Sequence, residues 1–208
     1  VTCEDFAQAI ADANPSSELA QRLDQFKRWY SQAGTPRVQA VGQYNPDSSS
    51  YTLTLSQSCA STPGQAHKAP FVIPVAMGLV AHDGRQLNLH LEGDAMPLGR
   101  DTVLVLTETE QTFTFVHVHS EPVPSLMRGF SAPVVLQAAL GEDALFTLLS
   151  HDSDPFNRWE AAQSLALRRL IKAVEHQGHA ELDARYAEAL RHVLRHPDLD
   201  AAFKDLVL

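Results

Sequence analysis

The spacing of apolar residues changes twice along the chain, and this change constrains the fold more than any other feature. Up to Gly34 apolar residues recur at helical spacing, from Thr35-Pro36 they alternate with polar residues, and from Gly141 helical spacing returns. Side chains share a face about every 3.6 residues in a helix and every second residue in a strand. The sequence therefore predicts a mixed α and β fold, in which a central antiparallel β-sandwich is flanked by an N-terminal helix pair and a C-terminal α-helical array. The expected boundaries are 1–34, 35–140 and 141–208.

The first region carries the signals of two helices. Thr2 and Asp5 form a variant of the capping box at the start of the first helix. Asn14-Pro15-Ser16-Ser17 breaks that helix, and a second one, with Leu19 and later apolar residues on one face, is expected to end at Gly34. A helix pair of this size is too small to bury its own apolar stripes.

The middle region carries short alternating segments separated by turn residues. Asp83-Gly84, within His82-Asp83-Gly84, is a strong hairpin signal. Seven or so short strands with no helix between them are typical of an antiparallel sandwich. The strands expected here are Tyr51–Ser56, Val72–Leu79, Leu87–Leu91, Thr102–Thr107, Thr112–Val118 and Pro133–Ala139.

The last region begins like a helical array. Asp154 is the expected N-cap of a helix with Pro155 at its first position, where the missing N–H costs nothing. That helix is expected to run to His176-Gln177-Gly178, and a further helix is expected to end before His196-Pro197. Helices stacked in this way bury their apolar faces only against successors.

Composition excludes several partners. The net charge of −9 and the pI near 5.5 disfavour binding to nucleic acid or to anionic lipid. No apolar run reaches the roughly 18 residues of a membrane span, and the N-terminus lacks the pattern of a signal peptide, so a soluble, cytoplasmic protein is expected. Cys3 and Cys59 lie at no metal-ligand spacing and are expected to be free thiols in a reducing compartment. Because Val1 is not methionine, we also expect that it is not the first residue of the gene product.

The ten histidines raise the question of a metal site. A helical zinc-peptidase site needs His-Glu-x-x-His, which does not occur in this sequence. His192 and His196 have the right separation, but Val193 stands where the glutamate should be. These two side chains are expected on an exposed helix surface near its C-terminus. The sequence also contains no Gly-x-Ser-x-Gly elbow and no phosphate-binding glycine loop.

One alternative stays open, in which a free-standing sandwich binds a peptide or a metal. His117 and His119 would lie on one face of a strand, and His90 or His82 could supply a third ligand from a neighbouring strand. A peptide could instead add to an open strand edge. Ordinary alternation already explains His117 and His119 as the polar face of a strand.

Several strings in the chain resemble, in order and spacing, the bacterial aminopeptidase N family of zinc peptidases. The resemblance extends from the start to about residue 178. The strings are Phe26-Lys27-Arg28-Trp29-Tyr30-Ser31-Gln32-Ala33-Gly34-Thr35-Pro36, Tyr44-Asn45-Pro46 with Tyr51-Thr52-Leu53-Thr54-Leu55-Ser56-Gln57, Glu110-Gln111-Thr112-Phe113-Thr114-Phe115, Pro122-Val123-Pro124-Ser125-Leu126 with Phe130-Ser131-Ala132-Pro133-Val134, and Phe156-Asn157-Arg158-Trp159-Glu160-Ala161-Ala162-Gln163-Ser164-Leu165.

The resemblance implies a zinc-dependent parent enzyme that releases N-terminal residues from peptides. It implies that residues 1–34 end a catalytic domain, that about 35–140 form its β-sandwich domain, and that 141–208 begin a helical domain walling the active-site chamber. The family's zinc and substrate motifs are missing from these residues, and Gly93-Asp94-Ala95-Met96 does not match its Gly-x-Met-x-Asn strand. No catalytic, cofactor-binding or metal residue is therefore assigned, and zinc is expected only in the parent. The expected role is an inactive interdomain scaffold whose partners are the other domains of the parent, with self-association through uncovered apolar faces.

Overall fold

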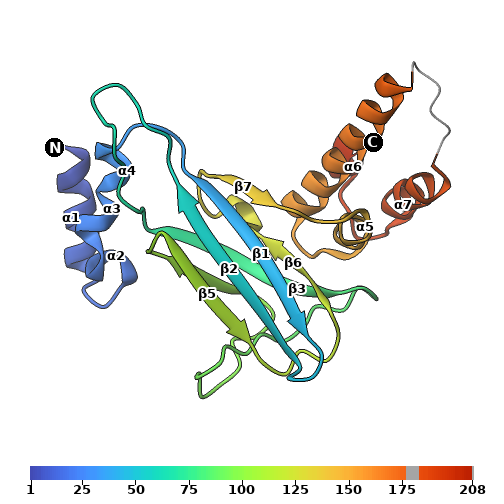
Figure 1. The fold of residues 1–208 in the computed structure, drawn as a ribbon, viewed down its shortest axis with the longest axis horizontal. Coiled ribbons are helices and arrows are strands. Elements are labelled where there is room, and N and C mark those ends of the chain that lie inside the picture. The colour runs from blue at the N-terminus through green and yellow to red at the C-terminus, as the bar shows by residue number, and fades with distance from the viewer. Residues whose placement is uncertain (177–182, 208) are drawn as a thin grey trace.

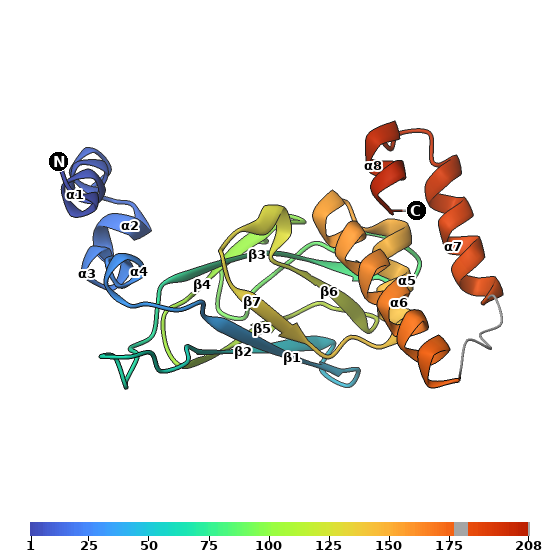
Figure 2. The same ribbon diagram turned by 90° about the horizontal axis from the view of Figure 1, so that it is seen from above.

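The computed structural model describes residues 1–176 and 183–207. Two stacked β-sheets form its centre, with short helices at one end and longer helices at the other (Figures 1 and 2). The expected mixed fold, a sandwich between N-terminal and C-terminal helices, is confirmed.

The N-terminal end begins with α1 (Cys3–Ala13), and the capping box predicted for it is present. The Thr2 hydroxyl accepts from the Asp5 amide at 3.2 Å, and the Asp5 carboxylate accepts from the Thr2 amide at 2.7 Å. The prediction of one continuous second helix up to Gly34 was wrong. The chain forms three short helices there, α2 (Glu18–Gln21), α3 (Leu23–Phe26) and α4 (Arg28–Ser31). Side chains of α3 and α4 donate hydrogen bonds to backbone carbonyls of the sandwich. Gln25 donates to Thr107 O at 2.6 Å, and Trp29 Nε1 donates to Val72 O at 2.9 Å.

The four-stranded sheet has the order β5-β2-β1-β7 and the three-stranded sheet the order β4-β3-β6. All neighbours are antiparallel except β1 and β7, which run parallel. Tyr51, Leu53 and Leu55 of β2 point into the core, as the alternation predicted, while the hydroxyl side chains between them are half-buried. The strands are β1 (Arg37–Asn45), β2 (Ser50–Ser58), β3 (Ile73–Ala81), β4 (Thr102–Leu106), β5 (Glu110–Phe115), β6 (Pro122–Leu126) and β7 (Val135–Ala138).

The predicted strand Leu87–Leu91 was wrong, although the turn before it is present. Gly84 has φ +90° and its amide donates to Ala81 O at 2.9 Å, which closes the turn. Beyond the turn, Leu89 bridges Gly99 and Leu91 bridges Phe115. Because consecutive bridges go to different partners, no continuous ladder forms.

At the other end lie α5 (Glu142–His151), α6 (Pro155–Glu175), α7 (Ala184–Arg195) and α8 (Ala201–Val207). Asp154 caps α6 by accepting from the Asn157 amide at 2.8 Å, and Pro155 occupies the first helical position, both as predicted. The expected stop at Gln177-Gly178 lies outside the described residues. No helix of the described part combines the length and hydropathy needed to cross a bilayer.

Apolar side chains gather in two cores. The first fills the space between the sheets and includes Leu53, Ile73 and Phe115. The second lies between the helices and the outer face of the three-stranded sheet, where Val80 of β3 and Val123 of β6 meet α5, α6 and α7. Strands β3 and β6 therefore contribute to both cores, and any side chain between β6 and α6 lies at the join of the two regions.

Candidate functional site: a polar junction between sheet and helices

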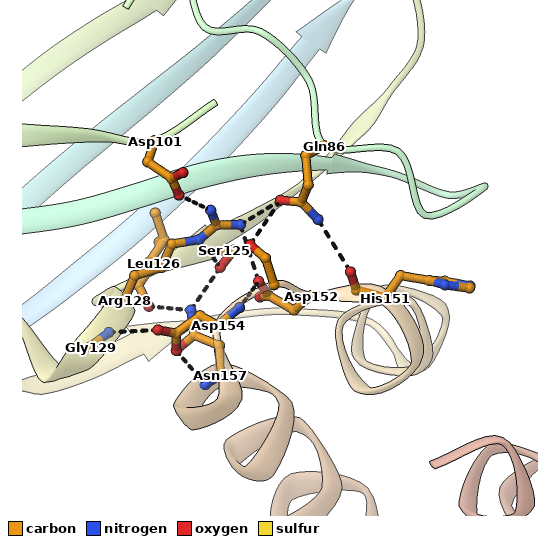
Figure 3. Close-up of polar contacts among 11 residues, drawn as sticks. Gln86, Asp101, Ser125, Leu126, Arg128, Gly129, His151, Asp152, Asp154 and Asn157 are labelled. Carbon is orange, nitrogen blue, oxygen red and sulfur yellow. Dashed lines mark hydrogen bonds and ion pairs between the residues drawn. The ribbon is translucent and has the colours of Figure 1, made fainter. Parts of the chain in front are cut away.

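Arg128 lies at the join of the sandwich and the helices, in the short 3-10 helix η1 (Arg128–Phe130) that follows β6. Its side chain is only 7% exposed. Nε donates to the Ser125 hydroxyl at 2.8 Å and Nη2 to Gln86 Oε1 at 2.8 Å, while Nη1 pairs with the Asp101 carboxylate (Figure 3). These three partners all belong to the sandwich region.

The fourth partner of Arg128 comes from the helical region. Nη2 donates to Asp152 Oδ1 at 3.1 Å, and Asp152 follows the last residue of α5. The same oxygen accepts from the Asp154 amide at 3.0 Å, which fixes the link between α5 and α6. Arg128 therefore connects the sheet directly to the turn between two helices.

Two further side chains cross the same join. Asn157 of α6 donates from Nδ2 to the Ser125 hydroxyl at 2.8 Å and to Leu126 O at 2.9 Å. Asp154 accepts from the Gly129 amide at 2.8 Å while it caps α6 (Figure 3). We call this set the polar junction: Gln86, Asp101, Ser125, Arg128, Asp152, Asp154 and Asn157.

The backbone around Arg128 adopts an uncommon conformation. Met127 has φ +57°, Gly129 φ +59° and Phe130 φ +54°. A left-handed conformation at a non-glycine residue is uncommon and costs free energy, on the order of 1–3 kcal/mol in strained cases. It persists only where surrounding contacts hold it, and the four bonds of Arg128 are such contacts.

Burial dominates the electrostatics of Asp152. Its side chain is 0% exposed, and this burial raises the pKa of the Asp152 carboxyl, although hydrogen bonds and the Arg128 charge act to lower it. Asp152 Oδ2 is buried and has no hydrogen-bond partner among the described residues. A buried carboxylate with one bare oxygen depends on the cation that is paired with it, here Arg128, because an uncompensated buried charge is costly.

A second buried arginine supports the helix side of the junction. Arg158 of α6 donates to Leu149 O and Ser150 O, both at 3.0 Å, and so satisfies carbonyls at the end of α5. The recorded donors of both arginines are thus committed to the protein itself. This arrangement fixes two regions relative to each other and offers no nucleophile paired with a base.

The structure brings together only two of the histidines considered for a strand-borne metal site, His90 and His117. β5 ends at Phe115 and His117 has φ +61°, so His117 and His119 do not continue a strand face, and that prediction was wrong. The rings of His117 and His90 lie 5.3 Å apart between centroids. His82 lies elsewhere, with Nδ1 3.3 Å from the Thr147 hydroxyl of α5.

His192 and His196 lie at the C-terminal end of α7, where His192 is exposed and His196 half-exposed. Their ring centroids are 5.9 Å apart, and His151 at the end of α5 lies 5.7 Å from His192. Within residues 1–176 and 183–207, no three His, Cys, Asp or Glu side chains are arranged to hold a metal ion. The described residues therefore do not fit zinc. Cys3 and Cys59 are both free.

Sequence reasoning assigned a role to one member of the polar junction, Asp154 as a helix N-cap, and did not predict the junction itself. Ser125 and Asn157 stand in strings that carried the family resemblance, but Arg128, Asp152 and Gln86 do not. No spacing rule brings together bonded residues as far apart in the sequence as Gln86 and Arg128, which are 42 positions apart. The one available signal was a charged residue, Arg128, in a segment otherwise apolar.

Comparison with known families agrees with the two-part architecture. Residues 34–139 match the family described as a domain of unknown function (DUF3458) with an Ig-like fold, and residues 142–208 match DUF3458_C, described as ARM repeats. Because the first match covers more than half of the chain, the protein belongs to the DUF3458 family. The fold thus defines an Ig-like sandwich joined to ARM-type helices.

The chain is also homologous over its whole length to part of aminopeptidase N, so the suspected resemblance is confirmed. It is 40% identical to aminopeptidase N of Escherichia coli (strain K12) and 36% identical to that of Haemophilus influenzae, covering 100% of this chain and 23% of each relative. The relative from Caulobacter vibrioides is 39% identical, with 22% of its length covered. A crystal structure of Legionella pneumophila aminopeptidase A in complex with aspartic acid superposes with a TM-score of 0.78 at 25% identity, over 100% of this chain and 22% of that one. The chain therefore spans less than a quarter of the length of these relatives.

Proposed function

We propose that this chain is a non-catalytic scaffold within a zinc-dependent aminopeptidase that releases N-terminal amino acids from peptides. In this proposal residues 1–34 end the catalytic domain, 35–140 form the β-sandwich domain and 141–208 begin the helical domain. The sandwich holds the catalytic domain apart from the helical domain and so helps to shape the active-site chamber. Zinc and the peptide substrate belong to the remaining domains, and the protein works in the cytoplasm, consistent with two free cysteines.

The polar junction is the observation that carries this proposal. Arg128 and Asp152, buried at 7% and 0% exposure, connect the sandwich to the helices with a direct ion pair of 3.1 Å. A scaffold must keep a fixed angle between the parts it joins, and a buried, directional network gives such an angle. A flexible tether would need neither the burial nor the left-handed backbone at Met127 and Phe130.

Uncovered apolar side chains at both ends support the same proposal. In α1, Phe6 is 62% exposed, and in α6, Leu170 and Val174 are 64% and 80% exposed. Such patches mark surfaces that contact other protein. Their positions at opposite ends of the sandwich suit a spacer between two neighbours (Figure 2). The same patches would let the isolated chain self-associate.

The direct test is an activity assay on the purified chain with added zinc. Incubation with a chromogenic amino-acid arylamide should release no amine above the buffer rate. Robust turnover that a chelator abolishes would contradict the scaffold proposal, because the chain itself would then hold a zinc centre.

A second candidate function, peptide binding by the sandwich, is favoured by one groove. Strand β7 forms an edge of the four-stranded sheet, and beside it lies a groove of about 390 Å³ lined by Leu136, Phe130 and Phe156, among other mostly apolar side chains. An extended peptide could add to this edge and place apolar side chains in the groove. Saturable binding of an extended apolar peptide, weakened by Leu136→Asp, would support this candidate over the scaffold alone.

A further inference from the structure

A second hollow, of about 440 Å³, lies beside the sandwich. It is bordered by β1, β2, β6, the end of β7 and the first turn of α5. Tyr44, Tyr51 and apolar side chains form part of its wall, and Glu121, Asp143 and His82 supply its ionisable groups. Its chemistry is therefore aromatic and acidic.

Tyr51 is the informative residue of this hollow. The residue is 3% exposed, yet its hydroxyl has no recorded hydrogen bond to any described residue. A Cβ added at Gly42, which lines the same hollow, would overlap the Tyr51 hydroxyl, so the ring reaches over Gly42 to the wall of the hollow. The hydroxyl oxygen itself is not fully buried, so it reaches the surface of the hollow. The hydroxyl is thus available to a group inside the hollow.

The charges around Tyr51 indicate which group that would be. Glu121 lines the same hollow as Tyr51. Burial is the larger cause that raises the pKa of Tyr51, and the negative charge of Glu121 raises it further. Glu121 is exposed and forms no ion pair with the described residues. Asp143 already pairs with Arg185 and also offsets the positive end of α5. Glu121 is therefore the carboxylate left to bind a cation.

We propose that this hollow binds an alkylammonium group, such as the end of a lysine side chain. Glu121 acts as the counter-ion, the Tyr51 hydroxyl accepts a hydrogen bond from the ammonium, and the ring of Tyr44 contacts the apolar stem. An ammonium near an aromatic ring and a carboxylate gains both cation–π and ion-pair attraction. This inference does not depend on the proposed scaffold role.

The test uses n-butylammonium as the probe and n-butanol as its uncharged match. Each is titrated into the 208-residue chain while the amide signals of Gly42, Tyr51 and Ala144 are followed by two-dimensional NMR. The ammonium should produce saturable shifts at these positions, and n-butanol should bind about tenfold more weakly or not at all, as expected for loss of a charged hydrogen bond. Equal binding of both probes would overturn the proposal.

Three variants separate a site from a general effect of charge. Glu121→Gln should weaken the binding of n-butylammonium about tenfold. Glu110→Gln, an equal charge change on exposed β5, should leave its affinity unchanged. Tyr51→Phe keeps the ring and removes only the hydroxyl, so it should weaken binding several-fold while the thermal midpoint stays about the same. The proposal fails if Glu121→Gln and Glu110→Gln have equal effects, or if Tyr51→Phe leaves affinity unchanged.

Discussion

The guanidinium of Arg128 lies directly against Gly78 of β3, in the place that any larger side chain would fill. A Cβ added at Gly78 would overlap Cζ and both terminal nitrogens of Arg128. Arg128 cannot retreat without giving up its bonds to Ser125, Gln86 and Asp152. The glycine therefore makes room for the ion pair that connects the sheet to the helices.

Gly78→Ala should destabilise the protein by about 1–3 kcal/mol, the usual cost of overpacking a well-packed site. Chemical denaturation at neutral pH measures the effect. Gly141→Ala is a matched control because open space surrounds Gly141 and its φ is −67°, so its effect should be smaller. In the double variant Gly78→Ala with Arg128→Met, the loss of stability should be smaller than the sum of the two single losses. The reason is that Arg128→Met removes the guanidinium that the added Cβ would overlap. Simple additivity would show that the overlap does not limit stability.

Arg128→Met should destabilise by about 3–5 kcal/mol, because it leaves the Asp152 carboxylate buried without its cation. Adding Asp152→Asn should recover part of that loss. Arg85→Met is the control, since the Arg85–Asp83 pair is 73% and 55% exposed and should contribute little to stability. Equal losses at Arg128 and Arg85 would contradict a special role for the junction.

Asp154→Ala should destabilise by about 1 kcal/mol or somewhat more, because the side chain both caps α6 and accepts from the Gly129 amide. Hydrogen exchange should locate the loss at the first turn of α6 and at Gly129. Asp198→Ala, an exposed acid whose side chain makes no recorded hydrogen bond, serves as the matched control. A loss spread evenly over all helices would contradict this assignment.

His151 should make stability depend on pH. Burial lowers the pKa of His151, the cations His192, Arg158 and His196 lower it further, and only Asp83 acts in the opposite direction. A histidine with a lower pKa in the folded state binds fewer protons there than in the unfolded chain. Stability should therefore fall as pH drops below about 6.5, the ordinary histidine value, and His151→Gln should reduce that fall. Urea midpoints measured between about pH 5 and pH 7.5 test this, and an unchanged slope in the variant would refute it.

Local chemistry explains which parts of the fold could be predicted from the sequence. The inward face of Tyr51, Leu53 and Leu55 follows from alternation, and the start of α6 follows from Asp154-Pro155. The segment Leu87–Leu91 has the same alternation but no single partner strand, and pairing is a property of the whole fold. The left-handed His117 and the three short helices α2–α4 are likewise set by distant contacts.

The polar junction could not be predicted, for a different physical reason. Its members come from the β3–β4 connection, β6, η1, the α5–α6 link and α6, and their meeting depends on the angle at which the helices dock. Neither Arg128 nor Asp152 stands in a sequence motif that predicts burial. The sequence therefore indicates the two regions well, but a single charged residue in an apolar segment does not predict the network that connects them.

We propose that this chain is a scaffold and that catalysis belongs to other domains of the parent. The most direct measurement is arylamide hydrolysis by the remaining domains of the parent, expressed separately, with and without this chain added in trans. Our account predicts no hydrolysis by the chain alone, increased hydrolysis when it is added, and a smaller increase with Arg128→Met. Hydrolysis by the chain alone, or no change in the activity of the remaining domains when it is added, would contradict the account.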